Sequence, residues 1–406
     1  MRYVDYLIVG GGIIGLTIAR ELKRRSPERK IVIIEKEDDV ARHSSGRNSG
    51  VLHAGFYYSA DSLKAKFTKE GNQAMTRYCE DNGLKINKCG KVVVATNDEE
   101  LQGLYELKRR ADRNGIELFW ISERELHLID PNVRTFKKAL YSPTTSTVDP
   151  VEVCNKLKEE IRASGVEILF NCPYRRRKDN LVYAGDEVFE CGYFINAAGL
   201  YADQIAHEAG FGTEYTIIPF KGIYLKYAKN QTDVHTNVYP VPNLKNPFLG
   251  VHFTKTVDGS IKIGPTAIPA FWRENYKGLS RFKLGEFLTI LRFEAKLFFS
   301  NAFNFRTLAF EEMKKYMKRH FIGLSLKMVK KIDSDGFGEF MRPGIRAQLL
   351  NKKTLELLQD FVIEGDHRSM HVLNAVSPAF TCSFPFAQYV VDAIRDKQGG
   401  HKVEAG

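Results

Sequence analysis

The sequence predicts a mixed α/β protein (α+β overall) in which the segments of an α/β half are interleaved with those of a β-rich half. The order strand, small-residue turn, helix occurs at 6–25 and again at 193–210, which is typical of an α/β half. Strand-rich segments at 217–228 and 249–264 follow, and a closing stretch at 371–396 comes after a helical region. The two kinds of segment therefore alternate along the chain.

The composition is that of an ordinary globular protein. The 406 residues allow two domains or one large domain with an inserted lobe, and 43% of them are hydrophobic and 27% charged. The six cysteines form no C-x-x-C pair and no metal-like spacing with histidine, so we expect reduced thiols in a cytoplasmic protein and no metal site. We expect no transmembrane helix, because no run of 18 uncharged apolar residues exists, and no signal peptide, because a strand begins at about residue 4.

The stretch "YLIVGGGIIGLTIARELKRR" at 6–25 places glycines between a buried strand and a helix, and Gly10, Gly12 and Gly15 match G-x-G-x-x-G. In this motif the first glycine permits the tight turn and the second lets the backbone approach a pyrophosphate. The third lets the helix pack closely on the strand. A purely structural turn is the alternative, but the residues that follow favour a Rossmann-type dinucleotide site.

The next strand, 31–34, ends in Glu35, 20 residues after Gly15, where a carboxylate can accept hydrogen bonds from a ribose hydroxyl. A second small-residue turn brings backbone near a ligand far downstream, and a nicotinamide enzyme would not need it. The loop after Glu35 and this second turn supply donors suited to a pyrophosphate and a ring edge: Arg42, Ser44, Ser45, Asn48, Ser49 and Gly50, then Ala198 and Gly199.

This constellation resembles the glutathione-reductase-like flavoproteins of the D-amino-acid-oxidase/glycerol-3-phosphate-dehydrogenase superfamily. Four blocks narrow the resemblance to the L-2-hydroxyglutarate oxidase/dehydrogenase family over nearly the whole chain. They are "GRNSGVLHAGFYY" (46–58), "NVYPVPNLKNPFLGVHFTKTVDGSIKIGPTA" (237–267), "GIRAQLL" (344–350) and "HVLNAVSPAFTCS" (371–383). The resemblance implies bound FAD and a β-rich substrate domain laid over the flavin.

The domain order follows from the resemblance and from periodicity. We expect FAD-binding segments at 1–85, 149–215 and 341–406, and substrate-domain segments at 86–148 and 216–340, with a basic helical lobe at about 276–335. Within them we expect helices at 61–82, 98–114 and 149–165, and strands at 90–96 and 166–170.

The reaction implied by the resemblance is oxidation of L-2-hydroxyglutarate to 2-oxoglutarate, with hydride transfer from C2 to flavin N5. It needs a base for the hydroxyl proton, and histidine is the natural base near neutral pH. His53 lies in the loop that the resemblance places at the flavin ring and is the first candidate; a flavin contact, even a covalent one, and a structural role are its alternatives. His252, in "GVHFT", is the rival base, with a structural role equally open.

The substrate carboxylates need cations, and arginine binds carboxylates in a bidentate way. Arg346 in "RPGIRAQ" is therefore the first candidate. Near the C-terminus, Asn374 and Ser377 precede a predicted helix whose N–H groups can stabilise negative charge on the reduced flavin. The supporting candidates for the substrate are Lys221, Tyr57, Tyr58 and Tyr224, with core packing as the alternative for each tyrosine.

Two alternatives of different kinds remain open. A sister enzyme would oxidise an amino acid, another 2-hydroxy acid or glycerol 3-phosphate, and a flavin-binding interaction protein would catalyse nothing. The electron acceptor is open among oxygen, a quinone and an electron-transfer flavoprotein. No nucleic-acid partner is expected, because no nucleic-acid motif accompanies the positive charge.

The net charge of +11 is concentrated in one segment. Between Arg281 and Lys331, twelve Lys and Arg residues stand against four acids, a balance of +8, and "FKLGEFLTILRFEAKLFF" in this segment is rich in Phe and Leu. A basic amphipathic surface that docks on anionic lipid is one interpretation, which would place a cytoplasmic enzyme at the inner face of the membrane. The other is a solvated helix kept soluble by Lys314, Lys315, Lys318 and Arg319.

Overall fold

The computed structural model describes residues 1–242, 248 and 250–399, so part of the block at 237–267 lies outside the described residues. The chain forms two compact units. Unit 1 comprises Met1–Asn48, Pro150–Ile218 and Ala347–Gly406, and unit 2 comprises Ser49–Asp149 and Pro219–Arg346. The predicted interleaving is confirmed.

The first domain boundary differs from the expectation, because residues 49–85 belong to unit 2 rather than to the FAD-binding half. The cause is local strand pairing. β3 (Val51–Leu52) and β4 (Ile86–Asn87) both pair with β8 (Ser146–Val148), and α2 (Leu63–Asp81) packs against β3 and β4. The remaining boundaries fall at 149/150, 218/219 and 346/347, near the expected 148/149, 215/216 and 340/341.

Unit 1 is built on a sheet whose central strands run parallel. β1 (Arg2–Val9) lies between β2 (Ile31–Ile34) and β12 (Glu187–Asn196). β2 continues to β9 (Glu167–Leu169), and β12 also pairs with β22 (Ser369–Asn374). The antiparallel additions are β10 (Tyr174–Lys178), β11 (Leu181–Ala184) and β21 (Val362–Gly365).

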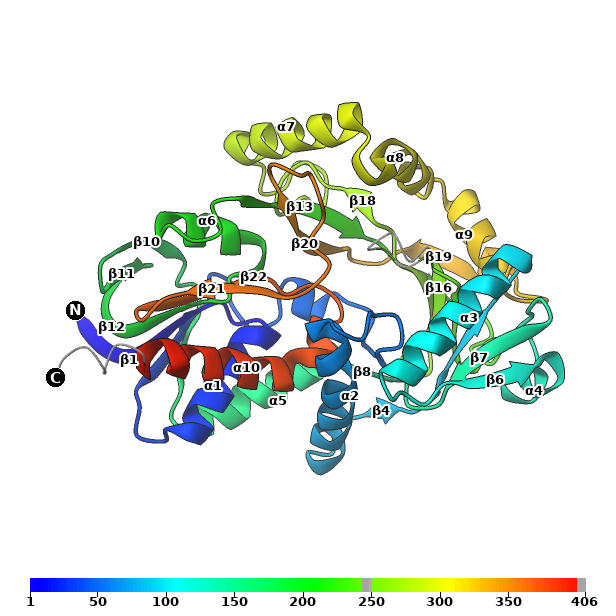
Figure 1. Cartoon of the computed structure of the whole chain (residues 1–406), viewed down its shortest axis with the longest axis horizontal. Coiled ribbons are helices and arrows are strands. Elements are labelled where there is room, and N and C mark those ends of the chain that lie inside the picture. Colours follow the sequence, from blue (N-terminus) through cyan, green and yellow to red (C-terminus); the bar gives the residue numbers. More distant parts are fainter. Residues whose placement is uncertain (243–247, 249, 400–406) are drawn as a thin grey trace. The chain divides into compact units, whose positions relative to one another are not determined.

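Helices cover the sheet of unit 1. α1 (Ile13–Arg25) packs against both α5 (Pro150–Ala163) and α10 (Ala379–Gly399), as Figure 1 shows. α6 (Ala202–Glu208) contacts β10, β12 and β22. All four residues of β2 are buried, which is the pattern of a parallel strand covered on both faces.

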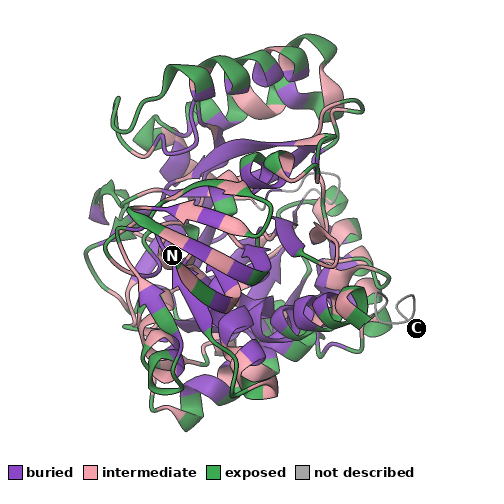
Figure 2. Ribbon diagram, turned by 90° about the vertical axis from the view of Figure 1, so that its left-hand side faces the viewer, coloured by how far each residue is buried: buried purple, intermediate pink, exposed green. Residues whose placement is uncertain are grey.

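Unit 2 is built on an eight-stranded, mostly antiparallel sheet, in the order β19-β14-β17-β16-β15-β5-β7-β6. Its one parallel pair, β5 with β15, joins the two chain segments of the unit. Figure 2, with the N-terminus facing the viewer, colours the strands around it mostly as buried or intermediate, and the strands of the unit 2 sheet are mostly buried too. They are β5 (Lys91–Val94), β6 (Phe119–Ser122), β7 (Lys138–Ser142), β14 (Leu225–Tyr227), β15 (Asn237–Pro240), β16 (His252–Lys255), β17 (Ile261–Gly264) and β19 (Phe337–Phe340).

Three helices of unit 2 begin with side-chain caps: α2, α3 (Asp98–Arg113) and α4 (Glu123–Ile129). The side chain of Asn97 caps α3 by accepting a hydrogen bond from Glu100 N (2.9 Å), and Ser122 and Glu125 form a capping box at α4. β13 (Tyr215–Gly222) and β20 (Gly344–Asn351) carry the chain across the unit boundaries, and β18 (Ile268–Pro269) pairs with β13. The other helices of unit 2 are α7 (Leu284–Ser300), α8 (Phe305–Lys314) and α9 (Lys318–Leu326).

The expected local elements are confirmed within a few residues. The helices expected at 61–82, 98–114 and 149–165 are α2, α3 and α5, and the strands at 90–96 and 166–170 are β5 and β9. All six cysteines are free thiols, five of them buried. Among the described residues, no helix is both long and apolar enough to cross a bilayer.

Candidate active site

Unit 1 collects its predicted nucleotide residues at one edge of the sheet. Val9 and Asn196 are partners at the ends of β1 and β12, and Asn196 is in turn paired with His371 of β22. Because the carboxyl ends of parallel strands meet at the same edge, the turns after β1, β2, β12 and β22 converge there.

The glycine turn after β1 has no room for side chains at two of its three motif positions. Gly10 has φ +109°, and a Cβ there would lie 2.5 Å from the carbonyl oxygen of Ala197. A Cβ on Gly15 would lie 2.0 Å from the carbonyl oxygen of Gly10. A Cβ on Gly12 would meet only the Ser45 hydroxyl, at 3.0 Å, so Gly12 is the position where the fold alone demands glycine least.

Glu35 ties the end of β2 to this turn. It is buried, and its two carboxylate oxygens accept hydrogen bonds from Gly11 N (2.7 Å) and Glu37 N (2.9 Å). Ser45 reaches the same place, because its hydroxyl accepts from Ile13 N (2.9 Å) at the start of α1. The turn thus presents a helix N-terminus beside a buried acid, the arrangement that holds a pyrophosphate and a ribose.

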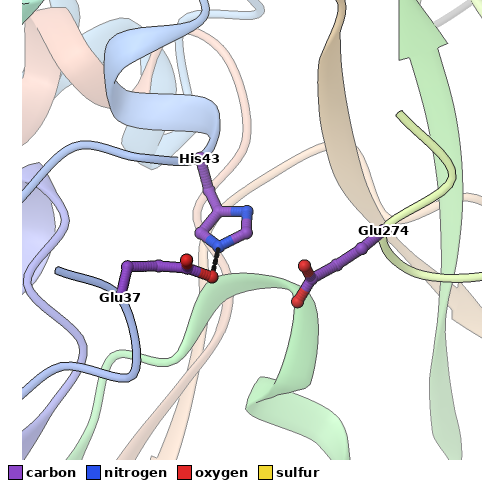
Figure 3. Close-up of side chains that lie close together, drawn as sticks. All are labelled: Glu37, His43 and Glu274. Atoms are coloured by element: carbon purple, nitrogen blue, oxygen red, sulfur yellow. Dashed lines mark hydrogen bonds and ion pairs between the residues drawn. The ribbon is translucent and has the colours of Figure 1, made fainter. Parts of the chain in front are cut away.

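Two of the other predicted nucleotide residues already form polar contacts within the protein. Arg42 pairs with Asp38 (2.8 Å), and Asn48 donates to the Ser45 carbonyl (2.8 Å), which braces the turn η1 (Ser44–Gly46). In the same loop His43 hydrogen-bonds Glu37 at 2.9 Å (Figure 3).

The second small-residue turn and the C-terminal positions also lie at this edge. Ala198 N donates to the Asn196 side chain (3.2 Å), and Gly199 has φ +56° with open space around a would-be Cβ. The Asn374 amide donates to the carbonyls of Leu358 and Asp360, so this side chain braces the backbone. Ser377 lies two residues before α10, and Ser49 and Gly50 belong to unit 2 instead.

His53 lies in the buried interior of unit 2 with its backbone clamped. The Asn72 amide donates to the carbonyls of Leu52 (3.1 Å) and His53 (3.2 Å), and His53 Nδ1 lies 3.5 Å from Lys91 Nζ. Burial, together with the charges of Lys91 and His252, holds the pKa of His53 well below its usual value. The imidazole is therefore neutral at physiological pH.

His252 begins β16 and stacks on Tyr239 of β15, with ring centroids 3.6 Å apart. Its Nδ1 bonds the carbonyl of Gly250 (2.8 Å), which fixes the proton on Nδ1. Among the described residues, its buried Nε2 has no hydrogen-bond partner. Burial lowers the pKa of His252 to about 3.

Lys91, which belongs to no sequence motif, is the centre of this cluster. It is fully buried, and its ammonium nitrogen lies 4.1 Å from the ring centroid of Tyr239 and 5.3 Å from that of Tyr57. Burial lowers its pKa to about 7. The available signal was a lysine directly before three valines, since a charge at the head of a buried strand is unusual.

The predicted substrate residues lie in the same unit. The Arg346 guanidinium sits 5.2 Å from the ring centroid of Phe248, and burial lowers its pKa to about 10. Tyr58 interacts electrostatically with both Arg346 and Tyr239, so these side chains are near one another. The Tyr57 hydroxyl is buried and has no hydrogen-bond partner within the described part of the chain.

Two further buried lysines flank this region. Lys262, also missed from the sequence, lies 4.8 Å from the ring centroid of Tyr224, and burial lowers its pKa to about 8. Lys221 contacts the Asn275 side chain at 3.4 Å, and burial lowers its pKa as well. The Tyr224 hydroxyl bonds to Ser49. His53, His252, Arg346, Lys221, Tyr57 and Tyr224 all belong to unit 2.

A family model described as "FAD dependent oxidoreductase" matches residues 5–393. The chain belongs to this family. Its curated relatives include the mitochondrial L-2-hydroxyglutarate dehydrogenases of Nematostella vectensis (34% identity; 98% of this chain and 91% of the relative covered) and Homo sapiens (34%; 97% and 89%). The L-2-hydroxyglutarate dehydrogenase of Escherichia coli K12 is 33% identical (96% and 93%). The resemblance stated from the sequence is confirmed.

Solved structures show the same fold. The dithionite-reduced L-α-glycerophosphate oxidase of Mycoplasma pneumoniae, with FAD bound, superposes with a TM-score of 0.77 at 23% identity (97% of this chain and 95% of that chain). Glycine oxidase from Geobacillus kaustophilus gives a TM-score of 0.69 at 17% identity (98% and 96%). The edge of unit 1 fits the FAD on which the family depends, because the turn leaves no room for a Cβ at Gly10 or Gly15, a Cβ at Gly12 would meet only the Ser45 hydroxyl, and a buried carboxylate stands at the end of β2.

Proposed function

We propose that this FAD-dependent oxidoreductase oxidises L-2-hydroxyglutarate to 2-oxoglutarate. The observation that carries the proposal is a surplus of buried positive charge in unit 2. Lys221 and Lys262 are buried, and neither of them forms an ion pair with any residue that the structure describes. A buried cation without a partner is costly, and an anionic ligand removes that cost. A dicarboxylate brings two negative charges to such a region.

The roles follow from geometry and charge. FAD, when bound, would supply the acceptor for the hydride that leaves C2 of the substrate. Arg346 offers a planar, bidentate donor for one carboxylate, and Lys221, Tyr57 and Tyr224 supply further donors. His53 takes the proton of the C2 hydroxyl, and burial keeps its imidazole neutral and able to do so. Gly10, Gly12, Gly15, Glu35 and Ser45 hold the nucleotide.

The sister reactions fit this charge pattern less well. An amino-acid substrate brings an ammonium, which the buried cations Lys221, Lys262 and Arg346 would repel. Glycerol 3-phosphate is an anion but carries only one charged end. The relatives that share about a third of their residues with this chain are named for L-2-hydroxyglutarate, which supports the dicarboxylate.

Anaerobic flavin reduction tests the proposal directly. L-2-Hydroxyglutarate should bleach the yellow protein, and D-2-hydroxyglutarate, L-lactate, L-amino acids and glycerol 3-phosphate should bleach it far more slowly. Equal bleaching by L-lactate would remove the need for a second carboxylate. No bleaching by any of them would leave a flavin-binding protein that is not an enzyme for these substrates.

We also propose that the segment from Arg281 to Lys331 docks on an anionic membrane surface. Ten of the twenty exposed large hydrophobic side chains of the described residues lie in this one segment, on α7, α8 and α9 and their connections (Figure 1). On α7, Leu284, Leu288 and Leu291 follow one another at helical spacing and are 61%, 56% and 39% exposed. Apolar side chains among basic ones are the pattern of an interfacial surface.

One of the four basic residues expected at this surface is not exposed. Lys315 is buried in an ion pair with Glu312, whose other oxygen accepts from Ala267 N (2.5 Å). Lys314, Lys318 and Arg319 are exposed. Each exposed cation near an anionic surface contributes about 1 kcal/mol. A lipid-soluble quinone is the acceptor that this position favours over oxygen or an electron-transfer flavoprotein.

Sedimentation with vesicles tests the docking. Binding should rise with the anionic lipid fraction, fall in high salt, and weaken when Lys314, Lys318 and Arg319 are changed together to Gln. Changing the exposed Lys226, Lys88 and Arg109 to Gln, which lie outside the segment, is the charge-matched control. Equal recovery in the supernatant with neutral and anionic vesicles at low salt would refute the docking and leave the oxidoreductase proposal intact.

A further inference from the structure

Lys91 has no conventional reason to be where it is. It opens β5, is fully buried, and is paired across the sheet with Asn237 of β15 and Ser142 of β7, neither of which carries a charge. Its only polar side-chain contact among the described residues is His53 Nδ1, at 3.5 Å. A lysine buried solely for packing would be replaced at lower cost by methionine or leucine.

The titratable groups that face Lys91 carry no negative charge near neutral pH. Burial raises the pKa of the Cys89 thiol to about 11 and raises those of the Tyr57 and Tyr239 phenols. Burial lowers those of the His53 and His252 imidazoles. The described surroundings therefore favour the neutral amine of Lys91, whose lone pair accepts a hydrogen bond.

This pairing decides what His53 can do. A neutral Lys91 accepts the proton on Nδ1, so His53 keeps its lone pair on Nε2, where a base needs it. A charged Lys91 would instead donate to Nδ1, put the ring proton on Nε2 and abolish the base. His252 lacks such a partner, because its Nδ1 faces the carbonyl of Gly250, which cannot take up a proton.

We propose that Lys91 is the final acceptor of the substrate proton, which reaches it through His53. This inference rests on the proposed function. The O–H bond of the C2 hydroxyl breaks and its proton goes to Nε2 of His53, while the proton on Nδ1 goes to the lone pair of Lys91 and forms an ammonium. The C2–H electron pair leaves to the oxidant of the proposed reaction, and the C2–O bond becomes a carbonyl. No imidazolium has to persist beside a buried cation.

Lys91 thus acts through His53 and is a positioning residue that also stores a proton. The step requires the amine to be neutral before each turnover. Activity is therefore expected above the pKa of Lys91, about 7, and should be lost as the pH falls through that value. A histidine working alone would lose activity only at lower pH, because burial holds its pKa well below the usual value.

The test measures the rate of anaerobic flavin reduction by L-2-hydroxyglutarate from about pH 5.5 to 9 in the holoenzyme. Lys91→Met should lower the rate by about tenfold or more and move the acidic limb of the profile to lower pH, and Lys91→Arg, which stays charged, should be slow at every pH. Lys88→Met, at an exposed surface pair with Glu80, is the matched control and should behave as wild type. An acidic limb that stays in place in a folded, yellow Lys91→Met protein would overturn the proposal.

A second readout is independent of turnover. Nitrogen chemical shifts of the protein labelled with ¹⁵N in histidine, with His53 assigned by its loss in His53→Gln, report which ring nitrogen carries the proton. At about pH 8.5 the wild type should carry it on Nδ1 and Lys91→Met should show a mixture. A proton on Nε2 in the wild type would exclude the relay. If the wild type has the expected tautomer but no substrate reduces it, the proposed function fails and not the pairing.

Discussion

At the nucleotide edge of unit 1 the polar side chains bond to backbone groups, whereas in unit 2 three buried lysines have no acid partner among the described residues. Glu35, Ser45 and Asn374 each meet a backbone group of their own unit. Lys91 and Lys262, by contrast, face aromatic rings and neutral imidazoles. The polar groups of the first region hold the backbone in place, whereas those of the second leave buried amines without a compensating acid.

The largest effect is expected on flavin content, at the nucleotide edge of unit 1. Gly12→Val should abolish flavin content, because a branched side chain would occupy the space between the turn and Ser45, where the pyrophosphate must approach. Flavin absorbance per protein measures this. Gly323→Val, where a Cβ meets nothing within 4 Å, is the control. A folded Gly12→Val protein that stays fully yellow would disprove the assigned cradle.

The next largest effect is expected on the rate of flavin reduction, at the buried histidines of unit 2. His53→Gln should keep the flavin and lower the anaerobic reduction rate by about two to four powers of ten, the usual contribution of a general base. Stopped-flow absorbance reports the rate. If His252→Gln produces this loss and His53→Gln does not, the two roles must be exchanged. Release of flavin from His53→Gln would instead favour a cofactor contact.

A smaller effect is expected on the KM, at the arginine that we assign to one carboxylate of the substrate. Arg346→Met should raise the KM for L-2-hydroxyglutarate by about 10- to 100-fold, in line with about 1.5–3 kcal/mol for a hydrogen bond to a charged group. The change in the KM for L-lactate, which has one carboxylate, should differ in size from the change for L-2-hydroxyglutarate. Arg342→Met, an exposed neighbour in sequence, should change neither value. Equal losses for both acids would place Arg346 at the carboxylate that they share.

The smallest effect concerns stability. The pKa of Lys262 falls from 10.5 to about 8 on burial, so the unfolded chain takes up the proton first as the pH drops. The free energy of unfolding therefore decreases as the pH falls from about 10.5 to about 8, and the full decrease is present below pH 8. Lys262→Met should lack this dependence and raise the free energy of unfolding at pH 7 by about 1–3 kcal/mol.

Denaturant titrations at several pH values measure this change. Lys226→Met is the matched control, because Lys226 is the exposed cross-strand partner of Lys262 on β14. An unchanged pH dependence in Lys262→Met would mean that the lysine reaches solvent in the ligand-free protein.

The sequence predicted the nucleotide edge of unit 1 better than the buried lysines of unit 2. The reason is the distance along the chain between the residues that form each region. Gly10, Gly15 and Glu35 lie within one βαβ unit, so their spacing alone indicates their role. Lys91 becomes buried only because β5 pairs with β15, almost 150 residues later. The same limit explains why Lys315 was expected at the surface. Its burial depends on Glu312 bonding to Ala267, which no local pattern reveals.

The interleaved order of the chain has a consequence for its synthesis. β1 emerges first, but β22 and α10, which complete its sheet and pack against α1, come from the last tenth of the chain. At about 5–20 residues per second, the first strand waits on the order of 20 seconds or more for this closing segment. Unit 2 has all its residues once Arg346 is made, whereas unit 1 does not. A nascent chain therefore exposes the unfinished sheet of unit 1 after all of unit 2 has been made, and exposed strand edges of this kind are prone to aggregate.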